Sequence, residues 1–276
     1  MSKTAVLHTH EDLVAQPELA DKLREEWNVV EEIDEWVGHL RNHPVPWKTE
    51  INWGAPRQKG VFHPSSISKT CDMALYLELL AADEWEKINA TTLQIFDTGT
   101  VIHEQLQYYQ HTRALTNDYE YLDEVAVAKG SALAEKLRMG GNCDGFMRRV
   151  LRLRGLDIDL RCLWEYKTIK SEGFAKLRSR PSKDYVRQVH AYMAATGIPL
   201  TIILYYNKNN SLKKAFFVFF DPAVWGPIQK RLEQIVQLAD NYELPDRNVN
   251  RSCVYCKFFK ECDPPISRRK GAPRLR

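Results

Sequence analysis

Long apolar runs are absent from this sequence of 276 residues, and none reaches the roughly 20 residues that span a bilayer. The first 13 residues contain no apolar signal core, so we expect neither secretion nor a membrane location. Internal repeats and low-complexity tracts are also missing. With 44% hydrophobic and 27% charged residues, the composition is that of an ordinary soluble protein, expected in the cytoplasm.

Disulfide bonds are not expected in a reducing compartment, so the six cysteines need another explanation. Three of them form a C-x2-C-x5-C pattern: Cys253, Cys256 and Cys262. Thiolates at this spacing can hold one metal centre, and a fourth ligand would close an all-cysteine site. Cys71 is the candidate for that ligand, and both zinc and an iron–sulfur cluster suit four thiolates. The other two are expected to be small core residues: Cys143 and Cys162.

A large charge of one sign is absent, since the formal net charge is only +3, but the two ends differ. Residues 1–40 carry three Lys or Arg against ten Asp or Glu, whereas residues 247–276 carry nine against two. The basic tail suits a polyanionic partner or a solvated end. The acidic N-terminus suits a solvated helix, a DNA mimic or a docking surface for a protein. We expect an acidic helical extension at 1–45 and the main domain at 46–276.

Apolar periodicity predicts the order of the elements. Helices are expected at 10–40, from Pro64 with Ser65 or Ser66 as the N-cap, at 92–115, at 183–196, and from Pro222 to 242 with Asp221 as the N-cap. Strands are expected at 124–129, 137–149, 157–167, 201–206 and 214–219. Residues 44–64 contain four prolines and are predicted to be irregular. The order predicts a mixed α/β core.

Two of these strands carry charged residues in a partly buried setting. Asp144 follows Gly141-Asn142-Cys143, and Glu165 and Lys167 flank a tyrosine. Strand side chains alternate, so Glu165 and Lys167 share one face, and a hairpin could place Asp144 beside Glu165. Two carboxylates bind magnesium or manganese, and a lysine can orient or deprotonate water for phosphodiester hydrolysis. An E-x-K triplet alone is also common on exposed strands, but here its neighbours are apolar and aromatic.

Further motifs occur around this triplet in a fixed order. They are G-x-x-x-H at residues 99–103, G-x-x-D at 141–144, E-x-K at 165–167 and Q-x-x-x-Y at 188–192. This set resembles the RecB-like branch of the PD-(D/E)XK nuclease superfamily. The usual Pro-Asp pair is absent, and Asp144 follows a cysteine, as is common in this branch.

The resemblance implies a restriction-endonuclease-like mixed sheet flanked by helices and a metal-dependent DNA nuclease. The implied ligands of magnesium or manganese are His103, Asp144, Glu165 and the backbone carbonyl of Tyr166. Lys167 would orient or activate the water, and Gln188 and Tyr192 would support the lysine and the DNA. An exonuclease on single strands or DNA ends is expected.

The cysteine pattern resembles a subgroup of the same branch, which includes CRISPR-associated RecB-like exonucleases, AddB-like proteins and phage relatives. In that subgroup one upstream and three C-terminal cysteines hold a 4Fe–4S cluster. The resemblance therefore implies a cluster lobe that joins the Cys71 helix to the C-terminus, in a prokaryotic or phage-infected cell. Recombination, repair, phage DNA processing and CRISPR spacer acquisition are the implied settings.

Two other classes of protein share some of these features. A non-catalytic DNA-binding or docking protein could use the same fold, but it would be expected to lack an acidic position or the lysine. A redox protein built around the cysteines would leave the ordered nuclease motifs unexplained.

Overall fold

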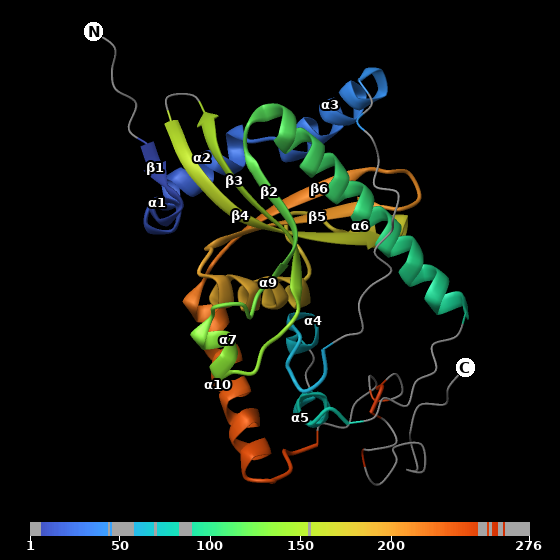
Figure 1. Cartoon of the computed structure of the whole chain (residues 1–276), viewed down its shortest axis with the longest axis vertical. Coiled ribbons are helices and arrows are strands. Elements are labelled where there is room, and N and C mark those ends of the chain that lie inside the picture. Colours follow the sequence, from blue (N-terminus) through green and yellow to red (C-terminus); the bar gives the residue numbers. More distant parts are fainter. Residues whose placement is uncertain are drawn as a thin grey trace.

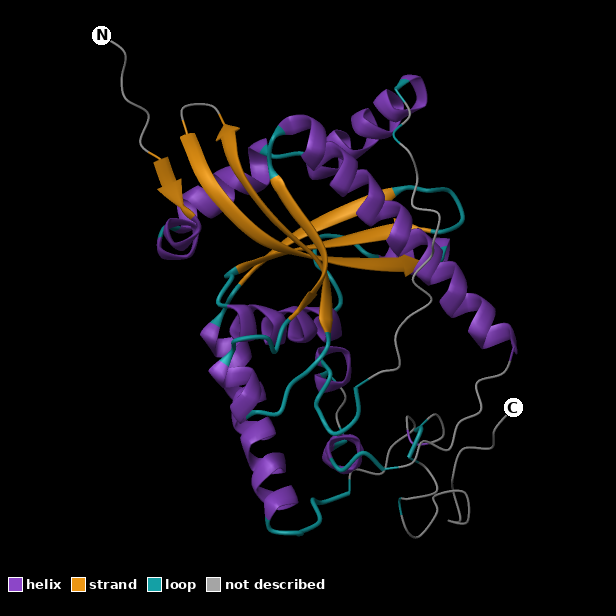
Figure 2. Ribbon diagram, viewed as in Figure 1, coloured by secondary structure: helices purple, strands orange, loops and turns teal. Residues whose placement is uncertain are grey.

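The computed structural model describes residues 7–43, 45, 58–68, 71–82, 90–153, 156–247, 253, 256–258 and 262. At its centre is a six-stranded mixed sheet with helices on both faces (Figures 1 and 2). The expected mixed α/β fold, a sheet flanked by helices, is therefore confirmed.

Five strands form the main path of the sheet in the order β2-β3-β4-β5-β6. Their bounds are β2 Glu120–Ala126, β3 Asn142–Leu153, β4 Leu156–Ile169, β5 Leu200–Asn207 and β6 Lys213–Phe219. Neighbouring strands are antiparallel except β4 and β5. That parallel pair requires a crossover, which α8 (Ser171–Lys176) and α9 (Lys183–Thr196) provide. A sixth strand, β1 (Leu7–Thr9), runs parallel to the start of β4.

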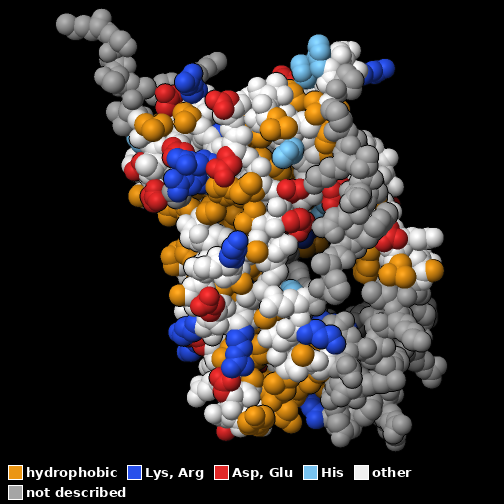
Figure 3. Space-filling view, in the orientation of Figure 1, with side chains coloured by type: hydrophobic (Ala, Val, Ile, Leu, Met, Phe, Trp, Pro, Cys, Tyr) orange, Lys and Arg blue, Asp and Glu red, His pale blue; other side chains and the backbone are white. Residues whose placement is uncertain are grey.

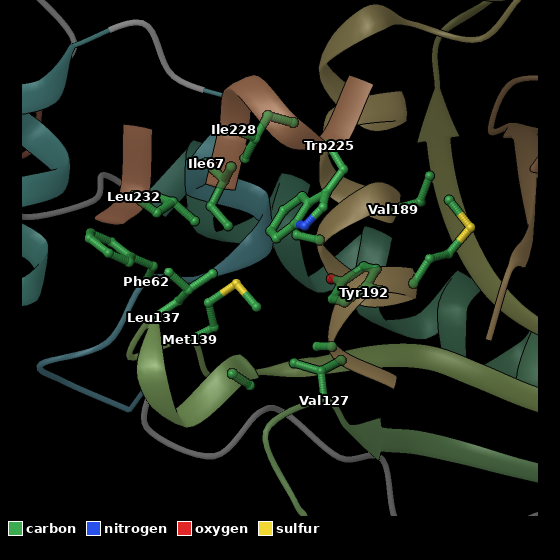
Figure 4. Packing of buried hydrophobic residues seen from close by; sticks show 14 of the residues in the cluster. Phe62, Ile67, Val127, Leu137, Met139, Val189, Tyr192, Trp225, Ile228 and Leu232 are labelled. Carbon is green, nitrogen blue, oxygen red and sulfur yellow. The ribbon is translucent and has the colours of Figure 1, made fainter. Parts of the chain in front are cut away.

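Two apolar cores lie on opposite faces of the sheet (Figure 1). The helices of the first core are α1 (His10–Ala15), α2 (Pro17–Glu26), α3 (Val29–Asn42) and α6 (Ala90–Asn117). The helices of the second core are α4 (Pro64–Ile67), α5 (Asp72–Leu79), α7 (Ala132–Lys136), α8, α9 and α10 (Pro222–Asp240). Along β4, Trp164 and Tyr166 enter the first core and Leu163 the second, because strand side chains alternate. Figure 4 shows the second core, to which α10 contributes Trp225 and Leu232.

The acidic N-terminal helices pack on the sheet and share the first core. Leu23 and Trp27 are buried there. Glu32 of α3 accepts two hydrogen bonds from the guanidinium of Arg149 on β3, at 3.0 and 3.3 Å, and pairs with Arg113 of α6 at 2.7 Å. The Arg149 guanidinium also lies 5.1 Å from the centre of the Trp27 ring. Part of the negative charge of the N-terminal helices is therefore neutralised by ion pairs within the fold.

The first turns after the proline-rich segment differ from the expectation. The helix expected from Pro64 is two helices, α4 and α5, and the N-cap of α4 is His63. The prediction of Ser65 or Ser66 as the cap was wrong, because Pro64 occupies the first helical turn and both serines lie within α4. The Ser66 hydroxyl instead donates to Glu78 of α5 at 3.0 Å. Most of 44–64 lies outside the described residues.

The strand expected at 137–149 begins later, at Asn142. The start of that range follows α7, and Arg138 adopts a left-handed backbone with φ of 50° that a strand cannot continue through. The N-cap of α10 is as expected, since the Asp221 carboxylate accepts the backbone N–H of Ala223 at 2.8 Å.

The charges of the described surface are mixed in sign. Figure 3 shows Lys and Arg side chains interspersed with Asp and Glu over the described part of that face. Within the same described residues, no helix is both long enough and apolar enough to cross a membrane.

Replacing Glu32 should destabilise the fold, because Arg113 and Arg149 would keep their charges without a partly buried partner. Glu32→Ala is expected to lower the free energy of unfolding by about 2–3 kcal/mol, measured by urea denaturation. Glu35→Ala removes an exposed carboxylate from the same helix and should change it by less than about 0.5 kcal/mol. Equal values for the two variants would show that the fold does not depend on this network.

Candidate active site

The expected catalytic residues gather where β3 and β4 separate. The register of the two strands ends with Gly145 opposite Trp164. One step further Asp144 and Glu165 would face each other, but the Asp144 Oδ2 atom instead accepts the backbone N–H of Tyr166 at 2.5 Å. The Asp144 carboxylate thus replaces a backbone carbonyl as the acceptor for Tyr166, and β3 and β4 separate at this point.

A pair of buried tyrosines supports the opening from the first core. The hydroxyls of Tyr121 on β2 and Tyr166 on β4 are 3.0 Å apart. The Tyr121 ring lies directly over Gly145, where an added Cβ would come within 2.8 Å of the ring atom Cζ. Only glycine fits this position, so the residue after Asp144 is fixed by packing.

Glu165 is the buried acid of the site, with 2% of its surface exposed. Its Oε1 atom accepts a hydrogen bond from Gln188 Nε2 of α9 at 2.7 Å and forms an ion pair with Lys167. The same Gln188 nitrogen donates to the Tyr192 hydroxyl at 3.0 Å, one helical turn further along. The Glu165 Oε2 atom is buried and has no hydrogen-bond partner among the described residues.

His103 approaches the opening from α6. Its Nδ1 atom lies 3.8 Å from Asp144 Oδ1, and its ring meets the edge of Tyr166 with centroids 6.0 Å apart. Burial and the nearby Lys167 ammonium lower the pKa of His103. The imidazole is therefore neutral near pH 7 and retains a lone pair for a metal ion. One turn earlier on α6, Gly99 lies beside Thr168. A Cβ added at Gly99 would lie 3.6 Å from the Thr168 hydroxyl oxygen, an ordinary van der Waals distance.

Burial dominates the electrostatics of the two acids. It raises the pKa of Asp144 to about 6 and, together with the charge of Asp144, raises the pKa of Glu165 to about 7. Burial lowers the pKa of Lys167, but the Glu165 and Asp144 carboxylates outweigh it and raise that pKa above its usual value. Lys167 is therefore an ammonium ion in this arrangement, held in the ion pair with Glu165.

The donor set fits a divalent cation. Glu165 presents a buried oxygen that accepts no hydrogen bond from the described residues, and leaving a buried acceptor without a partner costs free energy. Two atoms bound to one cation at about 2.1 Å lie at most about 4.2 Å apart, which the 3.8 Å between His103 and Asp144 satisfies. Within the described ranges no three His, Cys, Asp or Glu side chains already converge on one point. Metal binding would therefore draw these three groups together, and the Tyr166 carbonyl as a ligand stays a prediction.

Two residues that the sequence did not point to also contact the site. Gln107 Nε2 donates to the backbone carbonyl of Asp144 at 2.8 Å and to Glu124 Oε1 at 3.1 Å. Glu124 accepts a further bond from Asn142 Nδ2 at 3.3 Å. Gln107 lies four residues after His103, so its place on the same helix face was available as a signal. Glu124 has a left-handed φ of 52° within β2, which no local pattern indicated.

The four cysteines of the expected cluster line one pocket, and Phe258 joins them there. Cys71 lies at the N-cap of α5, and the other three come from the C-terminal segment. The structure therefore brings together thiols that are about 180 residues apart in sequence. Cys143 and Cys162 are fully buried in the two cores, as expected.

Comparisons with known proteins give distant similarities. No family model matches the sequence, and no curated protein matches it. Among solved structures, an alkaline exonuclease (LHK-Exo) from Laribacter hongkongensis is 13% identical, with 66% of this chain and 89% of that chain covered and a TM-score of 0.43. Its complex with dAMP has the same identity and coverage and a TM-score of 0.45. SSO0001 is 12% identical, with 86% and 97% covered and a TM-score of 0.45. These values assign neither a family nor a function.

The buried acids should make the metal-free protein less stable as the pH rises. The folded-state pKa values, about 6 for Asp144 and about 7 for Glu165, lie above the ordinary values of 3.8 and 4.5. At a pH between the ordinary and the folded-state pKa of each acid, the folded state binds more protons than the unfolded state. The free energy of unfolding therefore falls with increasing pH. We expect this fall in urea titrations with EDTA between about pH 4 and 7, and its reversal by excess Mn²⁺.

Glu165→Gln is the matched variant, because it keeps the shape and removes the titration. Its free energy of unfolding should depend less on pH than that of the unaltered protein, and Mn²⁺ should stabilise it less. Identical pH profiles of the two proteins would rule out a raised pKa at Glu165.

Proposed function

We propose that this protein is a DNA nuclease that requires magnesium or manganese. The observation that carries the proposal is the unsatisfied Oε2 atom of buried Glu165, with Asp144 and His103 on the other side of the sheet opening. A structural carboxylate would be expected to have both oxygens satisfied. The ordered sequence motifs identified above independently select the same side chains.

The chain's own residues have distinct parts in this reaction. His103, Asp144 and Glu165 would hold the cation, which lowers the pKa of a water molecule and neutralises charge on the phosphate. The Lys167 ammonium orients that water or offsets negative charge that develops on the phosphate oxygens. Gln188 holds the Glu165 carboxylate through Oε1, which leaves Oε2 for the cation.

DNA is the proposed substrate because cationic side chains follow the catalytic strand. Four of them are exposed between β4 and α9: Lys170, Lys176, Arg178 and Arg180. Phosphates would bind here by charge, without dependence on sequence. Digestion from ends or of single strands is the narrower proposal and rests on the resemblance to the RecB-like branch. A protein partner for the acidic N-terminal helices stays a prediction.

We also propose that the four cysteines hold a 4Fe–4S cluster. All four line one pocket, which supports a shared centre. Zinc suits four thiolates as well, and the preference for the cluster rests on the resemblance to the iron–sulfur subgroup.

The nuclease proposal is tested with end-labelled single- and double-stranded DNA and with circular single strands, each with Mn²⁺ and with EDTA. Lys167→Ala and Glu165→Ala should lower the cleavage rate at least about a hundredfold, since each removes a charge at the reacting phosphate. Lys129→Ala removes an exposed lysine outside the site and should cleave normally. Undiminished cleavage by either site variant would refute the assignment, and DNA binding without any hydrolysis would indicate a non-catalytic DNA-binding protein.

The cluster proposal is tested on protein purified without oxygen. It should be brown and contain iron and acid-labile sulfide, and Cys256→Ser should lose both the colour and most of the iron. Cys162→Ala changes a cysteine of the first core and should keep them. Colourless protein with one bound zinc would replace the cluster with a zinc site, and protein without either metal would reject both.

A further inference from the structure

The ammonium group of Lys167 has a second attractive neighbour besides Glu165. Its Nζ atom lies 4.6 Å from the centre of the Tyr185 ring, within the range of a cation–π contact. The Lys167 side chain is 18% exposed, so solvent screens this contact only in part. None of the nuclease motifs described above includes Tyr185.

The fold gives Tyr185 a defined position. It lies in the first turn of α9, three residues before Gln188 and seven before Tyr192, so all three share one helix face. The Tyr205 hydroxyl of β5 accepts the backbone N–H of Ser182, the N-cap residue of α9, at 3.0 Å. Hydrogen bonds on either side of Tyr185, at the cap and at Gln188, therefore fix the start of the helix.

A second tyrosine supports the ring from behind. Tyr205 is the register partner of Lys167 across the parallel β4–β5 pair, and it is 1% exposed. The Tyr185 and Tyr205 rings have centroids 6.0 Å apart at an interplanar angle of 56°. Tyr205 in turn meets the edge of Phe216 on β6 at 5.7 Å. Tyr185 is thus backed by the buried ring of Tyr205, which in turn packs on the partly buried Phe216, and these contacts limit its movement.

We propose that Tyr185 is a positioning residue, whose ring face holds the Lys167 ammonium toward the phosphate that would be cleaved. This inference rests on the proposed nuclease function. A lysine has four flexible methylene groups, and a single ion pair leaves its direction poorly defined. Two attractive contacts, the Glu165 carboxylate and the Tyr185 ring, define it. Tyr185 acts through Lys167 and not through DNA, so its loss should lower kcat more than it raises KM.

Kinetics of matched variants test this role. Tyr185→Leu removes the ring face but keeps an apolar side chain, and kcat should fall about tenfold with KM changed less than about threefold. Tyr185→Phe keeps the ring and should recover kcat to within about twofold. Tyr206→Leu removes the neighbouring tyrosine of β5, whose ring lies near Lys213, and should leave kcat unchanged. Equal losses in the Leu and Phe variants, or a loss confined to KM, would overturn the proposal.

A second readout does not depend on catalysis. In protein labelled with ¹³C at the lysine ε-carbons, the Lys167 ε-protons should resonate upfield of other lysines because of the ring current of Tyr185. The Lys167→Ala spectrum assigns that signal. It should persist in Tyr185→Phe and move to the ordinary lysine position in Tyr185→Leu. An upfield signal that survives in Tyr185→Leu would overturn the contact.

The two readouts separate the two proposals. If the unaltered protein does not cleave DNA, the nuclease proposal fails, and the NMR signal still decides whether Tyr185 holds Lys167.

Discussion

The burial of one carboxylate constrains the rest of the site. Glu165 lies within the sheet at 2% exposure, where a charged group is costly unless it is paired. One of its oxygens is compensated by Gln188 and Lys167, and the other has no hydrogen-bond partner in the described part of the chain. To compensate the Oε1 atom, α9 must bring the Gln188 amide next to it, and β4 must carry Lys167 two residues after Glu165. Under the proposed function, a cation would satisfy the second oxygen, and Asp144 and His103 across the opening would be its further ligands.

The opening between β3 and β4 depends on the first core as much as on these two strands. Tyr121, whose hydroxyl meets that of Tyr166, packs against Gly145, and Gln107 of α6 donates a hydrogen bond to the Asp144 carbonyl. The same helix is tied to the acidic N-terminal helices, through Trp36 to Thr112 at 2.9 Å and through Glu32 to Arg113. The N-terminal helices therefore help to hold the helix that carries His103. Their acidity has at least one internal use, separate from any partner they bind.

Local periodicity predicted the parts of the site that repeat within one element. The i, i+2 spacing of Glu165 and Lys167 and the i, i+4 spacing of Gln188 and Tyr192 placed each pair on one face, as the structure has them. The partners in contacts between distant segments left no such signal, although the i, i+4 spacing from His103 gave the helix face of Gln107. Gln107 on Asp144 joins residues 37 apart, and the ring of Tyr185 reaches Lys167 only through a parallel crossover. The helix cap at His63 and the late start of β3 were missed for a different reason. Pro64 and the left-handed Arg138 override the local pattern there.

The cysteine pocket is connected to the candidate active site through the second core. Cys71 and Cys262 pack against the second core, which also contains Val189 and Tyr192 of α9. That core is already held by α10, whose Arg231 binds Asp72 at 2.5 Å and the Ile67 carbonyl at 3.2 Å. On the same face of the sheet, α4 packs on α9 and α5 packs on α10. The main effect of a cluster would be to close a loop of about 180 residues between Cys71 and Cys253, which would restrain the C-terminal segment. Under that proposal the cluster would stabilise the segment that carries Cys253, Cys256 and Cys262, while contacts within the sheet and with α6 and α9 hold Glu165, Asp144 and His103.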